Sequence, residues 1–256
     1  MKLLSLNICG LGGKSRNHNL RSLLKSLGLD MILIQETMCS SSPALLTISK
    51  ILPKWEYCAI SASGLSGGLL TAWNPLLIKC KAFHTCADIL VQASVRGMAI
   101  PISVLNVYGP YIDREHFWAM ALRGGLLSTP NLVLGGDLNI TLYASEIWGK
   151  KASSNPLSHY FLSLFDSVGL VDLAPQETGP TWQNGRAGEH GISKRLDRFL
   201  ISSSLIPSLD VHRVWTHCAN LSDHFPICLE WDKNKGYVNY PFKFNHSWLN
   251  DPDFID

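Results

Sequence analysis

Short apolar runs separated by polar turns occupy most of the chain. The runs are three to eight residues long, and many are rich in leucine or in β-branched residues, which is typical of strands. We predict strands over residues 2–8, 31–35, 69–73, 89–95, 100–107, 132–134, 195–201, 211–214 and 226–231.

Three other segments, residues 19–27, 113–122 and 157–168, carry apolar residues at the spacing of one helix face. The second opens with Asp113, an acidic residue suited to a helix N-cap. The apolar positions on the three faces are Leu20, Leu23, Leu24 and Leu27; Phe117, Met120 and Ala121; and Phe161, Leu164 and Phe165.

The predicted elements include more strands than a simple alternating βαβ array would contain. This favours an α/β (α+β) fold in which layered sheets are flanked by helices. After Trp231 the chain loses strand alternation and carries only scattered aromatic residues. We therefore predict one domain over residues 1–231 and a linker-like tail over residues 232–256.

The composition limits the class of protein. With 256 residues and 46% hydrophobic residues, the chain can bury a sizeable core, which excludes a disordered protein. Charged residues make up only 16%, against about 25% in an ordinary soluble domain. A net charge of +2 argues against a nucleic-acid binder that works by bulk basicity.

The seven cysteines form no Cys-x-x-Cys pair, so we predict reduced thiols in an intracellular protein. The first apolar run stops at Asn7 and is too short for a secretory signal. No apolar stretch approaches the ~18 residues that a membrane span needs. We expect a monomer that has no membrane association and no obligate protein partner.

Polar side chains repeatedly follow the apolar runs, at the places where strands are expected to end. Strand ends gather functional side chains because the sheet holds them rigidly while loops leave room for a substrate. Each residue alone fits an ordinary turn or cap better than a catalyst, and Gly135-Gly136 fits a tight turn. The set comprises Asn7, Glu36, Tyr108, Asp137, Asn139, Asp223 and His224.

Together these residues supply hard oxygen ligands and one imidazole, without a soft ligand. Such a set suits Mg²⁺, with Mn²⁺ as an alternative, and the hydrolysis of a phosphate ester. A metal ion and a histidine offset charge on the phosphate, and a carboxylate activates water.

Six motifs in order resemble the endonuclease/exonuclease/phosphatase superfamily, which includes DNase I. They are Ser-Leu-Asn7, Ile-Gln-Glu36, Asn-Val-Tyr108-Gly-Pro, Gly-Gly-Asp137-Leu-Asn139, Arg-Leu-Asp197-Arg-Phe and Ser222-Asp223-His224, and they span residues 1–231. Within the superfamily, the start of the chain, Pro180-Thr181-Trp182 and the segment 193–202 look most like the endonuclease domain of plant LINE-type (non-LTR) retrotransposons. The tail resembles the segment that leads towards the reverse transcriptase, which is absent here.

The resemblance implies a DNase I-like two-layer β-sandwich flanked by helices, with the site at one end. It also implies a role for each matched residue. Glu36 would bind the metal, with Asn7 and Asp223 nearby, and Asp137 would orient or deprotonate the attacking water. The phosphate would be contacted by Asn139, Tyr108, Thr181 and His224. Asp197 would fix the tautomer of the His224 ring. One departure affects the site, because Tyr111 stands where many members carry an asparagine.

The segment 182–196 has a local basic bias and several glycines. We predict a hairpin or loop that enters a DNA groove and binds substrate through Arg186, Lys194 and Arg195, against the alternative of an ordinary solvated hairpin.

The leading hypothesis is a Mg²⁺-dependent DNA endonuclease that nicks one strand and leaves a 3′-hydroxyl. It would act in the nucleus if its substrate is chromosomal DNA, and otherwise in the cytoplasm. One alternative is a phosphatase acting on inositol phosphates or a lipid headgroup. Another is a vestigial retrotransposon fragment that folds and binds metal without turnover.

Overall fold

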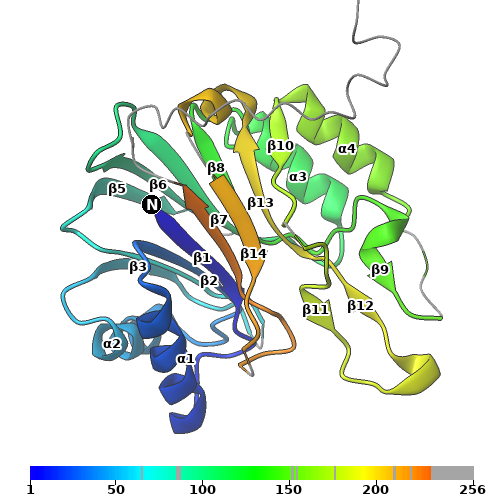
Figure 1. Cartoon of the computed structure of the whole chain (residues 1–256), viewed down its shortest axis with the longest axis horizontal. Coiled ribbons are helices and arrows are strands. Elements are labelled where there is room, and N and C mark those ends of the chain that lie inside the picture. Colours follow the sequence, from blue (N-terminus) through cyan, green and yellow to red (C-terminus); the bar gives the residue numbers. More distant parts are fainter. Residues whose placement is uncertain are drawn as a thin grey trace, which may run out of the picture.

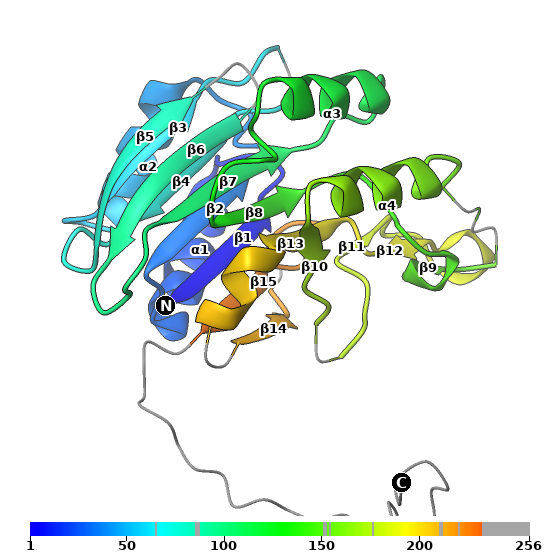
Figure 2. The ribbon, with the colours of Figure 1, turned by 90° about the horizontal axis from the view of Figure 1, so that it is seen from above.

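Two six-stranded sheets, stacked face to face, form the centre of the computed structural model (Figures 1 and 2). The structure describes residues 1–64, 66–84, 88–150, 153, 155–175, 177–209, 212–219 and 221–231. In spatial order the first sheet contains β14 (His212–Thr216), β15 (Ile227–Trp231), β1 (Lys2–Asn7), β2 (Met31–Gln35), β4 (Leu69–Trp73) and β3 (Glu56–Ile60). The second contains β10 (Leu170–Asp172), β13 (Asp197–Ser202), β8 (Leu132–Asp137), β7 (Ile102–Tyr108), β6 (Asp88–Val95) and β5 (Ile78–His84).

Helices cover the outer face of each sheet. α1 (Lys14–Leu27) and α2 (Ser41–Ile51) pack on the first sheet, and α3 (Arg114–Arg123) and α4 (Ser158–Ser167) pack on the second. Because each sheet is buried on both faces, its central strands are continuous apolar runs rather than alternating ones. In β1, for example, Leu3 faces the other sheet while Leu4 and Leu6 face the helices.

A buried polar network joins the two sheets near their centre. The side-chain amide of Gln35 donates to Asn106 Oδ1 at 2.7 Å, and the Asn106 amide donates to Thr71 Oγ1 at 3.0 Å. Ser5 accepts a further hydrogen bond from Gln35 at 3.1 Å, and all four side chains are buried. Since Gln35 precedes Glu36 and Asn106 lies two residues before Tyr108, this network fixes the relative position of two strand ends that carry predicted site residues.

A small third sheet projects beside the sandwich, in the order β11 (Trp182–Gln183), β12 (Ser193–Lys194) and β9 (Ile147–Trp148). β11 and β12 pair antiparallel, so the predicted hairpin is confirmed. It extends from the same end of the molecule as the loops that follow β1 and β2 (Figure 1).

The predicted fold class is confirmed, with corrections to single elements. α1 begins at Lys14 rather than residue 19, and α2, β3 and β5 were not predicted. Asp113 occupies the N-cap position of α3 but makes no capping hydrogen bond. The buried residue of that helix is Trp118, whereas Met120 is exposed.

Six cysteines are free thiols, and Cys86 lies outside the described residues. None of the helices in the described part of the chain has the length and apolar character needed to cross a bilayer. The predicted tail, residues 232–256, also lies outside the described residues.

Candidate active site

Two pairs of parallel strands end at the same edge of the sandwich and bring the predicted residues together. β1 and β2 run parallel, so Asn7 at the end of one lies beside the residue that precedes Glu36 in the other. β7 and β8 are also parallel and place Tyr108 opposite Asp137. β13 runs antiparallel to β8 and places Asp197 on the other side of Asp137.

Glycines make this close approach possible. A Cβ on Gly136 would lie 1.8 Å from the Val107 carbonyl oxygen, and a Cβ on Gly109 would lie 2.2 Å from the Leu138 carbonyl oxygen. On sequence alone Gly135-Gly136 also fitted a tight turn, but the pair lies within the last part of strand β8. Small residues are needed there because the backbone of β7 occupies the space that a side chain would take.

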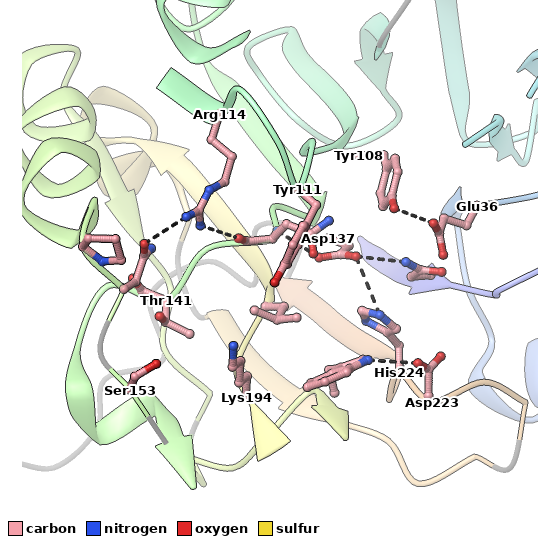
Figure 3. A pocket seen from close by; sticks show the side chains of 16 residues that line it. Glu36, Tyr108, Tyr111, Arg114, Asp137, Thr141, Ser153, Lys194, Asp223 and His224 are labelled. Atoms are coloured by element: carbon pink, nitrogen blue, oxygen red, sulfur yellow. Dashed lines mark hydrogen bonds and ion pairs between the residues drawn. The ribbon is translucent and has the colours of Figure 1, made fainter. Parts of the chain in front are cut away.

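Asp137 lies at the centre of the site, between residues of both sheets (Figure 3). Its Oδ2 accepts a hydrogen bond from Asn7 Nδ2 at 2.9 Å, and its Oδ1 accepts one from the Asn139 backbone at 3.0 Å. His224 Nε2 lies 3.7 Å from Oδ2. Burial, with the neighbouring Asp197 charge, raises the pKa of Asp137 to about 7, although His224 and Asn7 oppose the rise. A carboxyl group with this pKa suits proton exchange near neutrality.

His224 is held by Asp197. The ring Nδ1 and Asp197 Oδ2 are 2.9 Å apart, and both side chains are buried. Burial alone would lower the pKa of His224, but the charge and hydrogen bond of Asp197, with Asp137 and Asp223, outweigh it and raise the pKa to about 9. The imidazole is therefore cationic near neutral pH, with Nε2–H directed towards Asp137 and available to an anion beside it.

Glu36 and Tyr108 form a second group across the site from His224 (Figure 3). The Tyr108 hydroxyl donates to Glu36 Oε1. Burial, together with this bond to Glu36, raises the pKa of Tyr108, so the phenol stays protonated and remains a donor. Glu36 and Asn139 have positive φ values of 51° and 54°, a conformation that is uncommon for residues other than glycine and that concentrates at functional sites.

Asp223 lies at the rim of the pocket. Trp182 Nε1 donates to its Oδ2 at 2.9 Å, and the Ser222 hydroxyl donates to its Oδ1 at 3.1 Å. The backbone N–H of Gln183 also donates to the Asp223 carbonyl at 3.1 Å, which ties the loop of residues 222–224 to the hairpin.

These side chains line a pocket of about 530 Å³. One part holds the residues described so far. The other part is lined by Tyr111, Arg114, Ser153 and Lys194 (Figure 3). Arg114 donates to the Asn139 carbonyl at 3.2 Å and so supports the loop that carries Asn139. The pocket therefore combines carboxylates at one side with two cations at the other.

Two groups of side chains have ligand types that suit a metal ion. Carboxylate oxygens of Asp137 and Asp197 and a ring nitrogen of His224 all lie within 4.8 Å of one another, but these groups already bind each other. Glu36 Oε2 takes part in none of the contacts found in the described part of the chain, and Asp223 is partly open to solvent. A hard divalent ion prefers such accessible oxygens, so the chemistry of the donors fits an ion beside Glu36 better than one inside the buried trio.

Most of the predicted site residues meet in this pocket. The lining includes Asn7, Glu36, Tyr108, Asp137, Asn139, Lys194, Asp223 and His224. Asp197 lies behind His224, with its Oδ2 at 2.9 Å from the ring Nδ1. Arg186 is exposed on the loop of the hairpin.

Two predicted substrate contacts have a different position. Thr181 is fully buried, and its hydroxyl oxygen accepts the backbone N–H groups of Leu196 and Asp197, each at 2.9 Å. It therefore positions the strand that carries Asp197 rather than reaching into the pocket. Arg195 is buried and forms ion pairs with Glu146 at 2.9 Å and Asp172 at 2.7 Å, so its guanidinium cannot enter a DNA groove.

Sequence reasoning missed Arg114, Asn155 and the contact made by Trp182. Arg114 donates to Asn155 Oδ1 at 3.2 Å as well as to the Asn139 carbonyl, so it joins the two segments on its side of the pocket. A lone arginine after a turn gives no signal of such a position. Trp182 was marked only as part of a motif, although its indole nitrogen binds Asp223 directly.

Comparison with known proteins agrees with the fold. Residues 4–224 match the model of the Endonuclease/Exonuclease/phosphatase family. An exodeoxyribonuclease from Bacillus subtilis is 26% identical over 255 residues, which covers 89% of this chain and 98% of the relative.

Solved structures show the same fold at low sequence identity. The endonuclease domain of TRAS1, a telomere-specific non-LTR retrotransposon, superposes with a TM-score of 0.67 at 18% identity, covering 90% of this chain and 97% of the other. An AP endonuclease from Leishmania major gives a TM-score of 0.72 at 18% identity, covering 91% and 87%. The chain belongs to the endonuclease/exonuclease/phosphatase family.

Proposed function

We propose that the protein is a Mg²⁺-dependent DNA endonuclease that nicks one strand and leaves a 3′-hydroxyl, as in LINE retrotransposition. The observation that carries the proposal is the arrangement around Asp137. A buried carboxyl group with a raised pKa lies beside a cationic histidine, in an open pocket that also exposes Glu36. The similarity of the fold to a retrotransposon endonuclease domain supports the choice of DNA as substrate.

The side chains divide the reaction between them. Asp137, held by Asn7, accepts a proton from the water whose oxygen attacks phosphorus. The bond from phosphorus to the 3′-oxygen breaks, and that oxygen leaves as a hydroxyl after taking a proton from solvent water, while Asp137 later returns its proton to the solvent. His224, kept cationic by Asp197, and the Tyr108 hydroxyl lie at the same pocket and stabilise negative charge on the phosphate oxygens.

Glu36, with Asn7 and Asp223 nearby, would hold the metal ion. When bound, a divalent cation supplies positive charge that offsets the phosphate and lowers the barrier to attack. Glu36 is suited to this because its backbone conformation and its bond to Tyr108 fix the carboxylate at the pocket.

We expect the protein to convert supercoiled plasmid to nicked circles when Mg²⁺ is present. Addition of EDTA should abolish nicking, and Mn²⁺ should restore it, because the oxygen donors of the site accept either ion. The measurement is the fraction of nicked plasmid with time, followed by extension of the nick with a DNA polymerase, which requires a 3′-hydroxyl. His224→Ala serves as the control for contaminating nucleases.

Other results would support other functions. Release of inorganic phosphate from a small phosphate ester, without a cut in DNA, would show a phosphatase instead. A folded protein that binds the metal but acts on neither substrate would be a non-catalytic fragment. Nicking that is equal in the wild-type and His224→Ala proteins would reject the enzyme assignment.

The hairpin beside the pocket is proposed to contact DNA outside the cut. Its loop is well organised, because Asn184 Oδ1 accepts the backbone N–H groups of Arg186 and Ile192, each at 3.1 Å. Arg186 is exposed at the loop, and Lys194 lines the pocket at the base of β12. Two cations on a rigid projection suit phosphate contacts in a groove.

We expect the double substitution Arg186→Ala and Lys194→Ala to weaken DNA binding. The slope of log K against the logarithm of the salt concentration should become shallower by about 2, since each phosphate contact contributes about 0.9 to that slope. The measurement is fluorescence anisotropy of a labelled duplex between low and moderate salt. Arg123→Ala with Lys79→Ala removes two exposed charges elsewhere and is the matched control. Equal slopes for the two double variants would leave the hairpin without a role in binding.

A further inference from the structure

Positive charge is unevenly distributed along this nearly neutral chain. Residues 1–55 contain seven lysines and arginines but only two carboxylates, whereas the whole chain has 22 basic and 20 acidic residues. The excess therefore belongs to the first part of the chain. That part forms β1, β2 and the two helices on the outside of the first sheet.

Basic residues of α1 lie along one face of the helix. Lys14, His18, Arg21 and Lys25 occur at i, i+4, i+7 and i+11, and α1 contains no acidic residue. At a rise of 1.5 Å per residue, this row is about 16 Å long. Consecutive phosphates of one DNA strand are spaced by about 3.4 Å along the duplex axis, so the row matches several phosphates.

The row borders a groove between α1 and α2. The groove has a volume of about 350 Å³, and its lining includes Lys14, His18, Arg21 and Lys50 but no carboxylate. Arg21 donates to the Lys50 carbonyl at 2.7 Å, which fixes the two helices to each other. Among the residues that the structure describes, none of these four side chains forms an ion pair, so the charge of Lys14, Arg21 and Lys50 is not offset within the protein.

Helix α1, which forms one wall of the groove, begins beside the loop that leads out of the active site. Arg16, in the first turn of α1, donates to the carbonyls of Cys9 at 2.7 Å and Gly10 at 2.6 Å, in the loop that follows Asn7. α1 and the β11–β12 hairpin extend on opposite sides of the end at which β1 and β2 finish (Figure 1). A polyanion that crosses the pocket from the hairpin side is thereby directed towards the exposed N-terminus of α1.

We propose that the groove between α1 and α2 is a second DNA-binding surface, which holds the phosphate backbone of duplex DNA flanking the cut. This inference rests on the proposed function for its substrate class. Lys14, Arg21 and Lys50 supply the charge, and the free N–H groups at the start of α1 add to it, since Gly13 provides no side-chain cap. The surface explains how a chain of net charge +2 grips an extended polyanion, because its positive charge is concentrated where the DNA passes.

The test compares two triple variants that lose the same number of charges. The groove variant is Lys14→Gln, Arg21→Gln and Lys50→Gln. The matched control is Lys79→Gln, Lys81→Gln and Arg96→Gln, three exposed residues on β5 and the turn after β6 in the other sheet. Circular dichroism and thermal unfolding first establish that both proteins fold as the wild type does.

DNA binding is measured by fluorescence anisotropy in the presence of EDTA, with two labelled duplexes of about 10 and about 30 base pairs. The longer duplex is about 100 Å long, at 3.4 Å per base pair. For the longer duplex we expect the groove variant to bind roughly tenfold or more weakly, with a salt slope reduced by about 2.7, equal to three phosphate contacts. The control should match the wild type, and the loss should shrink with the shorter duplex.

Three outcomes separate this inference from the proposed function. If the wild type nicks plasmid but the groove variant binds the longer duplex as the wild type does, the inference is wrong and the endonuclease assignment remains. Equal losses in both triple variants would also overturn it, by showing an effect of net charge alone. If the wild type cuts no DNA yet only the groove variant loses binding, the DNA surface stands and the endonuclease assignment fails.

Discussion

Replacing Asp137 with asparagine should reduce the rate of plasmid nicking by a factor of about 10²–10⁴, the range associated with loss of a general base. Asparagine has nearly the same size as aspartate, and its one oxygen can keep the hydrogen bond from the Asn139 backbone, although its amide nitrogen cannot accept from Asn7 Nδ2. It cannot accept a proton from water at neutral pH. The loss should therefore appear in the rate at saturating DNA, while the dissociation constant for the duplex changes little.

The same substitution should cost less thermal stability at pH 8 than at pH 5, which distinguishes the loss of a titrating carboxyl group from general misfolding. The folded-state pKa of Asp137 is raised from an ordinary value of 3.8 to about 7, chiefly by burial and by Asp197. A raised pKa means that the favourable contribution of this group is complete below about pH 3.8 and is lost as the pH rises through about 7. At pH 8 the wild type therefore carries the full cost of the buried charge, and Asp137→Asn does not.

Both effects can be measured on one preparation. Nicking is followed with Mg²⁺, and the melting temperature is followed in EDTA at pH 5 and pH 8. Asp166→Asn, on the exposed face of α4, is the matched control and should change neither quantity. A variant that nicks at the wild-type rate would show that Asp137 does not activate water, and a variant that melts much earlier at pH 8 would attribute its inactivity to unfolding.

The core strands could be predicted from the sequence because both faces of each sheet are covered. A strand that contacts the other sheet on one side and helices on the other is apolar at most positions, as in β1, β2 and β4. The missed elements lack that signal. β3 and β5 lie at sheet edges and are partly exposed, and the first turns of α1 are polar because they face solvent. α2 contains Pro43 and β-branched residues, which obscure its helical pattern.

The membership of the candidate site was predictable, but the direction of some side chains was not. Lys194 and Arg195 are neighbours in sequence and carry the same charge, yet one lines the pocket and the other is buried among carboxylates. Successive side chains of an extended segment point to opposite faces, so which of the two reaches DNA depends on the register of β12 with its partners. That register is set by contacts with β9 and β11, distant segments that a motif does not describe.

The buried partners of Arg195 form a charge cluster behind the site. Arg195 and Arg198 both bind Glu146 and Asp172, with Arg198 Nη1 at 2.6 Å from Asp172 and 2.9 Å from Glu146 Oε1. Arg198 is fully buried. Burial alone would raise the pKa of Glu146, but the hydrogen bonds and charges of Arg198 and Arg195 outweigh it and lower the pKa. Because Glu146 follows the loop of Asn139 and Arg195 precedes Asp197 by two residues, the cluster fastens the two segments that flank Asp137.

We expect Glu146→Gln to destabilise the protein by about 3 kcal/mol, because removing one member of a buried ion pair leaves a charge without compensation. For a domain of this size the melting temperature should fall by about 6–12 °C, at 2–4 °C per kcal/mol. Glutamine has nearly the volume of glutamate, so a cavity does not explain the effect. Glu189→Gln is the matched control, since Glu189 pairs with Lys150 at 2.7 Å on the surface, where both side chains are mostly exposed. Such a surface pair contributes about 0–1 kcal/mol. The free energy of unfolding of both variants is measured by urea unfolding. Equal losses of this free energy would show that the buried cluster contributes no more than a surface ion pair.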